Sequence, residues 1–213
     1  MKIYGARLSP FVRKVLVVAE LKGLAYEQVD VMPGQVTPEY LKISPLGKIP
    51  ALEDGDLGVS DSTVICEYLE EQYPAVSTLP KSLIDRAHAR WLEEYADTRL
   101  MELCGGGIFF ERVIKPLFLK QPTDEAKVEK TINELLPPVL DYLESQVPDQ
   151  GFMFGDFGRV DISLVGPLIN AGYAGYKVDA ARWPQLARYL GHVMAQPVVA
   201  KILQIEARLM GRG

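Results

Sequence analysis

The strongest constraint on the fold is a short apolar segment followed at once by a helix that begins at a proline. Residues 1–4 can form a strand, and Ser9-Pro10 then marks a helix start, because proline suits the first helical turn. Apolar residues recur at helical spacing as far as Leu21, and Gly23 follows as a capping residue. The helix N-terminus can bind an anion such as a thiolate. The alternative is that Ser9 is only a helix cap.

The next 50 residues extend this start into a complete small domain. Residues 25–31 read as a second strand, parallel to the first because a helix connects them. Thr37-Pro38 repeats the capping signal and opens a short helix. A hairpin follows around an Asp-Gly-Asp turn, and then Asp61-Ser62 caps a helix that runs through Tyr73. Residues 1–74 therefore predict the order β-α-β-α-β-β-α, which is the α/β thioredoxin-like arrangement.

A proline-bearing linker over residues 75–81 separates this domain from an all-helical region, residues 82–213. Gly105-Gly106-Gly107 is expected to separate the first two helices. Pro137-Pro138 predicts a kink or two helices, and Pro167 raises the same question in the next helix. The helices are expected at residues 83–103, 108–119, 124–146, 160–176, 183–194 and 197–210.

Composition excludes several classes of function. A net charge of −5 without long basic runs argues against nucleic acid as the main partner. No apolar stretch reaches about 18 residues and no signal-peptide core is present, so we expect no membrane partner and a cytoplasmic location. The only cysteines, Cys66 and Cys104, are expected to be buried free thiols. His88 and His192 lack metal-ligand spacing, so no metal is predicted.

Positive charge gathers near the proposed anion site on a domain that is acidic overall. Arg7, Arg13, Lys14 and Lys48 fall near the Ser9 turn or in the Lys-Ile-Pro segment. A local positive site of this kind suits a small anionic ligand. The alternative for Arg13 and Lys14 is that they are solvated surface charges.

Three loops of the first domain should converge where strands end and helices begin. The first is the Ser9 turn. The second holds Ile49-Pro50, where a cis peptide would turn the N–H and C=O of Ile49 outward to pair with a peptide backbone. The third is Asp61-Ser62, which offers donors to a carboxylate and an acid to an ammonium group. A ligand with a thiol, a peptide backbone and an amino-acid end satisfies all three.

These residues resemble the cytosolic glutathione transferases over essentially the whole chain. Residues 9–15 and 22–27 look most like the serine-type classes, including the tau class and its bacterial relatives. Residues 44–52 are similar to the Asn-Pro-x-Gly-(Lys/Gln)-(Val/Ile)-Pro-x-Leu signature, and residues 61–65 take the place of Glu-Ser-x-x-Ile. The resemblance implies a thioredoxin-like domain plus a helical domain, glutathione as co-substrate, and a homodimer active in detoxification.

The resemblance also implies roles for individual residues. Ser9 would stabilise the glutathione thiolate, with Phe11 beside it. Lys48 and Gln35 would hold the glycyl carboxylate. Ile49 would pair with the cysteinyl backbone, Pro50 would fix that geometry, and Asp61 with Ser62 would take the γ-glutamyl end.

The second domain carries weaker signals. Asp161 keeps half of a capping box whose cap position is Gly158, so we assign Asp161 to folding. Asp97 would reach across a dimer to the glutamyl amine, or lie on a solvated helix face. A hydrophobic electrophile would bind among apolar residues that equally suit a plain core, namely Leu8, Met101, Cys104, Ile108 and Phe109.

The residues leave the activity open among three readings. The first is a transferase in which glutathione sulfur attacks an electrophilic carbon. The second is a binding or scaffold protein that keeps the fold without the chemistry. The third is a glutathione-dependent isomerase or peroxidase, although the Ser-Ser-Cys-Ser run of zeta-type isomerases is absent.

Overall fold

The computed structural model describes residues 1–32 and 36–211, and over that part the chain forms two compact units. One unit comprises Met1–Leu79 together with the segment from Gln196 onward, and the other comprises Pro80–Ala195. The first unit contains a four-stranded mixed sheet in the order β2-β1-β3-β4, as far as the described residues show. Its strands and helices are β1 (Lys2–Tyr4), α1 (Pro10–Leu21), β2 (Glu27–Val29), α2 (Pro38–Ile43), β3 (Ala51–Asp54), β4 (Leu57–Ser60), α3 (Ser62–Gln72) and α9 (Pro197–Leu209).

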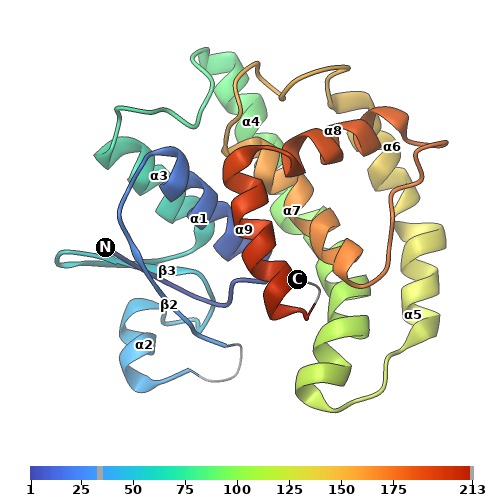
Figure 1. The fold of residues 1–213 in the computed structure, drawn as a ribbon, viewed down its shortest axis with the longest axis horizontal. Helices are drawn as coiled ribbons and strands as arrows, with labels where there is room; N and C mark the ends of the chain where they lie inside the picture. Colours follow the sequence, from blue (N-terminus) through green and yellow to red (C-terminus); the bar gives the residue numbers. More distant parts are fainter. Residues whose placement is uncertain (33–35, 212–213) are drawn as a thin grey trace. The chain divides into compact units, whose positions relative to one another are not determined.

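The sheet confirms the predicted thioredoxin-like arrangement. Strand β1 is parallel to β2 and antiparallel to β3, which pairs in turn with β4 as a hairpin. Ile3 lies opposite Leu52 across β1 and β3, and both side chains are fully buried. Helices α1 and α3 pack together and contact the strands, while α2 contacts β3 and β4 (Figure 1). This sheet holds the loops of the candidate site in place.

Both predicted serine or threonine caps are present in the first unit. The Ser9 side chain accepts a hydrogen bond from Val12 N at the start of α1, and Thr37 accepts one from Tyr40 N at the start of α2. Each cap is followed by proline in the first helical turn. These hydrogen bonds satisfy amide donors that have no partner within the helix, which explains why both helices begin where the sequence predicts.

Helix α9 belongs to the first unit. It lies against α1, as Figure 1 shows. Amphipathic spacing shows that a helix has an apolar face but not which surface covers it, so spacing alone does not indicate this grouping. The sequence-based boundaries at residues 74 and 82 stay a prediction.

The named elements of the second unit are all helices. Helix α4 continues into two π-helical segments, η1 and η2, and helix α5 continues into a third, η3. Helix α7 is buried over residues 159–171, and its Arg159 Nε lies 2.8 Å from Oε1 of Glu93 on α4. The elements are α4 (Leu83–Tyr95), η1 (Ala96–Leu100), η2 (Glu102–Leu119), α5 (Glu125–Lys130), η3 (Thr131–Leu135), α6 (Pro137–Gln146), α7 (Arg159–Tyr173) and α8 (Pro184–Met194).

The expected helix break at Gly105-Gly106-Gly107 is wrong, because η2 continues through all three glycines. A Cβ on Gly107 would lie 2.7 Å from the Thr131 side chain, and one on Gly105 would meet Met101. These two glycines therefore permit close packing rather than ending a helix. The expected division at the proline pair is confirmed, since η3 ends at Leu135 and α6 begins at Pro137.

The proline inside α7 does not divide the helix. The helix continues through Pro167, which is buried in its middle. At its start, the Asp161 carboxylate accepts hydrogen bonds from Gly158 N at 2.8 Å, Met153 N at 2.9 Å and Tyr189 Oη at 2.6 Å. Burial raises the pKa of this carboxyl, and the three donors act in the opposite direction. Asp161 therefore joins the start of α7 to the preceding loop and to α8.

Glu70 fastens the linker that leaves the first unit. Its carboxylate accepts hydrogen bonds from Thr78 N at 3.0 Å and Thr78 Oγ1 at 2.9 Å, and from the Ser77 hydroxyl. Lys22 Nζ lies 2.9 Å from Glu70 Oε2. Burial alone would raise the pKa of Glu70, but these donors and the Lys22 ammonium lower it to about 2.

We expect Glu70→Gln to lower the free energy of unfolding by about 2 kcal/mol at neutral pH. Because the folded pKa is depressed to about 2 from 4.5, ionised Glu70 stabilises the fold above about pH 4.5, and this contribution is lost as the pH falls toward 2. Urea unfolding at several pH values should show a smaller acid dependence in the variant. Glu71→Gln, at the exposed next position of α3, is the matched control and should behave as wild type.

Candidate functional site

Ser9 lies at the N-terminal end of α1, where the helix presents unpaired N–H groups and partial positive charge. Its Oγ is the acceptor in the 3.4 Å contact with Val12 N, so this contact does not use the hydroxyl hydrogen. That hydrogen can be donated to an anion at the helix end. Ser9 and Phe11 are both partly exposed, and Pro10 between them is buried.

Gly5 brings the Ser9 turn next to the second predicted loop. A Cβ on Gly5 would lie 2.5 Å from the Val12 side chain and 3.2 Å from Ile49 Cβ, and Gly5 has a φ of +145°. Only glycine permits this approach of the β1–α1 loop to residue 49. Gly5 was not among the predicted site residues, although a glycine directly between a strand and a proline-initiated helix was the available signal.

The Ile49–Pro50 peptide bond is cis, as predicted. Pro50 is buried and Lys48 is exposed. The Lys48 carbonyl accepts hydrogen bonds from Tyr40 Oη and Ser44 Oγ, both at 2.7 Å, and these bonds hold the loop from the α2 side. The outward direction of the Ile49 N–H and C=O stays a prediction.

The third predicted segment is joined to the second by a backbone hydrogen bond. Asp61 N donates to the Pro50 carbonyl at 3.3 Å. Asp61 Oδ1 accepts from Thr63 N at 2.9 Å and from Val64 N at 3.1 Å, so this carboxylate caps α3. Asp61 is exposed with a φ of +86°, whereas Ser62 is buried. A non-glycine residue at this φ is uncommon and occurs preferentially at functional sites.

Two buried basic residues of α1, Arg13 and Lys14, bind side chains on two other helices of the first unit, α9 and α3. Lys14 is almost fully buried, and its Nζ lies 3.3 Å from Thr63 Oγ1 in the first turn of α3. Arg13 is fully buried and forms two hydrogen bonds with Glu206. The alternative of solvated surface charges is therefore wrong for Arg13 and Lys14, because both side chains are buried. The local positive site near the Ser9 turn stays a prediction.

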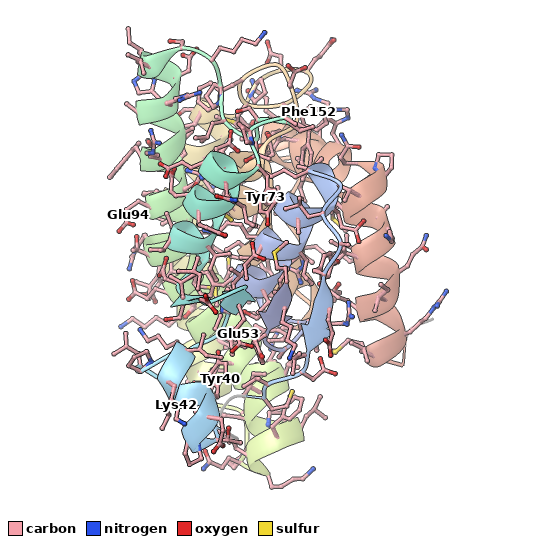
Figure 2. All side chains as sticks on the ribbon, turned by 90° about the vertical axis from the view of Figure 1, so that its left-hand side faces the viewer. Tyr40, Lys42, Glu53, Tyr73, Glu94 and Phe152 are labelled. Atoms are coloured by element: carbon pink, nitrogen blue, oxygen red, sulfur yellow. The ribbon has the colours of Figure 1, made fainter. Side chains whose placement is uncertain are left out.

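Tyr4 is the other hydroxyl-bearing residue near the start of the chain, and the sheet occupies it. Its hydroxyl donates to Glu53 of β3, and its ring packs against Tyr40 with 6.0 Å between centroids. Figure 2 labels Glu53 and Tyr40. Burial and the neighbouring Glu53 carboxylate raise the pKa of Tyr4 to about 12. Tyr4 therefore stays protonated at neutral pH, and its proton is directed to Glu53.

The remaining predicted residues are Gln35 and the apolar group proposed to bind an electrophile. In that group Leu8 belongs to the first unit and Met101 to the second, and both are partly exposed. Gln35 lies outside the described residues. Cys104, Ile108 and Phe109 are buried in the second unit, in agreement with the core alternative. Burial raises the pKa of the Cys104 thiol, which leaves it an inert apolar side chain, and Cys66 is also buried and forms no disulfide.

Within residues 1–32 and 36–211, no cluster of three or more His, Cys, Asp or Glu side chains is arranged to share a metal ion. None of the helices in those ranges combines the length and the apolar character needed to cross a membrane.

The site thus combines two helix N-termini, a serine hydroxyl and a cis-proline loop, and comparison with known proteins gives this combination a family. The family model described as "Glutathione S-transferase, N-terminal domain" matches residues 3–77. A "Probable glutathione S-transferase GSTF2" of Oryza sativa subsp. japonica is 30% identical over 210 residues, covering 96% of each chain. The chain belongs to the glutathione S-transferase family.

Other similar proteins include an isomerase and a bacterial transferase of known structure. The "Maleylacetoacetate isomerase" of Pseudomonas aeruginosa is 30% identical over 205 residues, covering 92% of each chain. The crystal structure of a glutathione S-transferase from Rhodospirillum rubrum superposes with a TM-score of 0.85 at 27% identity, covering 95% of this chain and 91% of that one. The chain is therefore similar to plant and bacterial transferases and to an isomerase, while the serine-type, tau- or zeta-like subclass stays a prediction.

Proposed function

We propose that this transferase-family protein conjugates glutathione to a hydrophobic electrophile, with Ser9 as the residue that stabilises the thiolate. An ordinary thiol has a pKa of about 8.5, so little of it is ionised at neutral pH. A hydroxyl donor at a helix N-terminus favours the ionised form and lowers the pKa toward neutrality. The thiolate sulfur then forms a bond to the electrophilic carbon, and the leaving group departs with the electron pair of the broken bond.

The rest of the tripeptide is proposed to extend across the three loops of the first unit. Lys48, with Gln35, holds the glycyl carboxylate, and Ile49 pairs with the cysteinyl backbone beside Pro50. Asp61 and Ser62 take the γ-glutamyl end at the N-terminus of α3, and Phe11 lies beside the thiolate. The carboxylate of Asp61 also caps α3 through Oδ1, which accepts from Thr63 N and Val64 N, so the ammonium group would share this carboxylate with the helix cap.

The observation that carries this proposal is the position of the Ser9 hydroxyl at the start of α1. The hydroxyl hydrogen is not used in the Val12 contact, and Tyr4, the alternative hydroxyl, is directed to Glu53. Gly5 and the Asp61–Pro50 hydrogen bond support the convergence of the three loops. Family membership supplies glutathione as the thiol, in keeping with the name of the rice relative.

Calorimetric titration with glutathione, followed by a conjugation assay with an activated aryl halide, tests the proposal. We expect binding, together with a thiolate absorbance that appears at lower pH than in free glutathione. Binding without turnover of any electrophile would remove the transferase activity. Failure to bind glutathione would favour the scaffold reading.

A second candidate is a glutathione-dependent isomerase, which the Pseudomonas aeruginosa relative favours at the same level of identity as the rice transferase. The same thiolate would add to a conjugated double bond, allow rotation about it and then depart, so that glutathione is regenerated. Maleylacetoacetate should therefore be included in the substrate panel. Isomerisation without net consumption of glutathione would identify this activity, and consumption with product formation would identify conjugation. Peroxide consumption tests the peroxidase reading.

We also propose that the protein is a homodimer, as the family resemblance implies. Asp97, in η1 of the second unit, is the residue that would reach the glutamyl amine of a partner's site. Sedimentation equilibrium measures the assembly directly. Asp97→Asn should weaken glutathione binding only if the protein is dimeric and this contact forms.

A further inference from the structure

Helix α9 is joined to α1 by ion pairs near both ends of the shared surface. At the Ser9 end of α1, Arg13 Nε lies 2.8 Å from Glu206 Oε1, and Arg13 Nη2 lies 2.6 Å from Glu206 Oε2. At the other end, Lys201 Nζ lies 2.9 and 2.8 Å from the two carboxylate oxygens of Glu20. The first pair is completely buried, whereas 60% of the Lys201 side chain is exposed. The two pairs therefore differ in burial and in distance along α1 from Ser9.

The buried pair acts one helical turn from the hydroxyl of the candidate site. Arg13 N donates to the Ser9 carbonyl at 2.9 Å, so the residue that carries the guanidinium is bonded directly to Ser9. The adjacent Lys14 reaches Thr63 in the first turn of α3. Residues 13 and 14 thus hold the start of α1 against α9 on one side and against α3 on the other. A shift of Arg13 would displace Ser9 with it.

The free energy of burying two charges indicates that the Arg13–Glu206 pair contributes more to the orientation of α1 than to stability. Removing two charges from water costs free energy that their attraction often fails to recover, and a well-packed apolar pair of similar volume can be as stable. What an apolar pair does not supply is the planar two-point contact between a guanidinium and a carboxylate, which fixes direction as well as distance. The cost of burial is therefore offset by a defined orientation of the first turn of α1.

We infer that Arg13 and Glu206 are positioning residues, which hold the first turn of α1 so that the Ser9 hydroxyl meets the glutathione sulfur. This inference rests on the proposed function and extends it to a residue at the opposite end of the chain. It gives α9, which carries Glu206, a role in the ionisation of glutathione. A purely stabilising role is the competing explanation, and the two predict different results for variants.

The test compares three variants of the full-length protein. Glu206→Gln keeps the shape of the side chain but removes its charge, and the double variant Arg13→Met/Glu206→Leu replaces the pair with apolar groups. Lys201→Gln removes the exposed pair at the far end of α1 and is the matched control. For each variant, urea unfolding gives stability, thiolate absorbance between about pH 5 and 9 gives the pKa of bound glutathione, and steady-state kinetics separates kcat from KM.

We expect the double variant to remain nearly as stable as wild type while the pKa of bound glutathione rises by about 0.5 to 1 and kcat at slightly acidic pH falls by about 3- to 10-fold. The KM for glutathione should change by less than about 2-fold, and Lys201→Gln should match wild type in every measurement. A stable double variant with an unchanged thiol pKa would overturn the inference. If the double variant does not fold, Glu206→Gln carries the same comparison under conditions where circular dichroism shows it folded.

Amide hydrogen exchange provides a readout that does not depend on the proposed chemistry. The Val12 and Arg13 amides, which donate to the two oxygens of Ser9, report directly on the first turn. Their exchange should accelerate by about 10-fold or more in Glu206→Gln and stay unchanged in Lys201→Gln. Unchanged exchange in both would refute the positioning role even if Ser9 is catalytic. Faster exchange in a protein that does not ionise glutathione would instead refute the role of Ser9.

Discussion

Replacing Ser9 with alanine is expected to lower kcat for conjugation by about 100-fold, because a donor aimed at a developing or resident anion typically contributes that much. The pKa of bound glutathione should rise from near neutrality toward its ordinary value of about 8.5, so the loss should shrink as the pH is raised. Stopped-flow rates with an aryl halide over a range of pH would measure both effects. Wild-type turnover in Ser9→Ala would remove Ser9 from the mechanism.

Ser9→Ala also removes a helix cap, which by itself should cost about 1 kcal/mol of stability. Thr37→Ala is the matched control, because Thr37 caps α2 in the same way, with a proline next in sequence and a 3.2 Å hydrogen bond from Tyr40 N. It should lose similar stability and keep full activity. Ser9→Thr retains a hydroxyl at the same position and is expected to recover much of the rate.

Asp161→Ala is expected to lower the free energy of unfolding of the second unit by about 4 kcal/mol. The substitution leaves Gly158 N, Met153 N and Tyr189 Oη without their acceptor in a buried position, and each unsatisfied donor costs about 1–3 kcal/mol. Both tryptophans, Trp91 and Trp183, belong to Pro80–Ala195, so fluorescence-detected unfolding in urea reports on this unit.

Asp156→Ala is the control for this substitution, because Asp156 is an exposed acid in the loop just before α7. Its effect should stay within about 0.5 kcal/mol. A loss below about 1 kcal/mol in Asp161→Ala would contradict the role assigned to the buried carboxylate. Asp161→Asn should be intermediate, since its amide keeps one acceptor oxygen and places a donor opposite the other amide hydrogen.

Local chemistry made most of the first unit predictable from the sequence. Ser9-Pro10 and Thr37-Pro38 specify helix starts through a side-chain acceptor and a fixed φ, and both lie where expected. The turn at Gly55, with its φ of +59°, specifies the hairpin in the same way. Each of these signals depends on neighbouring residues alone, which is why spacing was sufficient to find them.

Features that depend on distant partners were not predictable in this way. Gly107 reads as a helix breaker by itself, but in the structure it admits the Thr131 side chain from another helix. Arg13 reads as a surface charge by itself, but Glu206 lies 193 residues away in sequence and takes it into the interior. In the candidate site, Ser9, Pro50 and Asp61 were found from motifs, whereas Gly5 required knowledge of how closely Ile49 approaches.

The pairing of Arg13 with Glu206 has a consequence for the order in which this protein matures on the ribosome. Strands β1–β4 and helices α1–α3 of the first unit leave the exit tunnel early, yet the carboxylate that neutralises the buried guanidinium is translated 193 residues later. Until then, burying Arg13 would strand an uncompensated charge, so the nascent unit should stay loosely packed around α1. Completion of the first unit therefore waits for α9 to be translated.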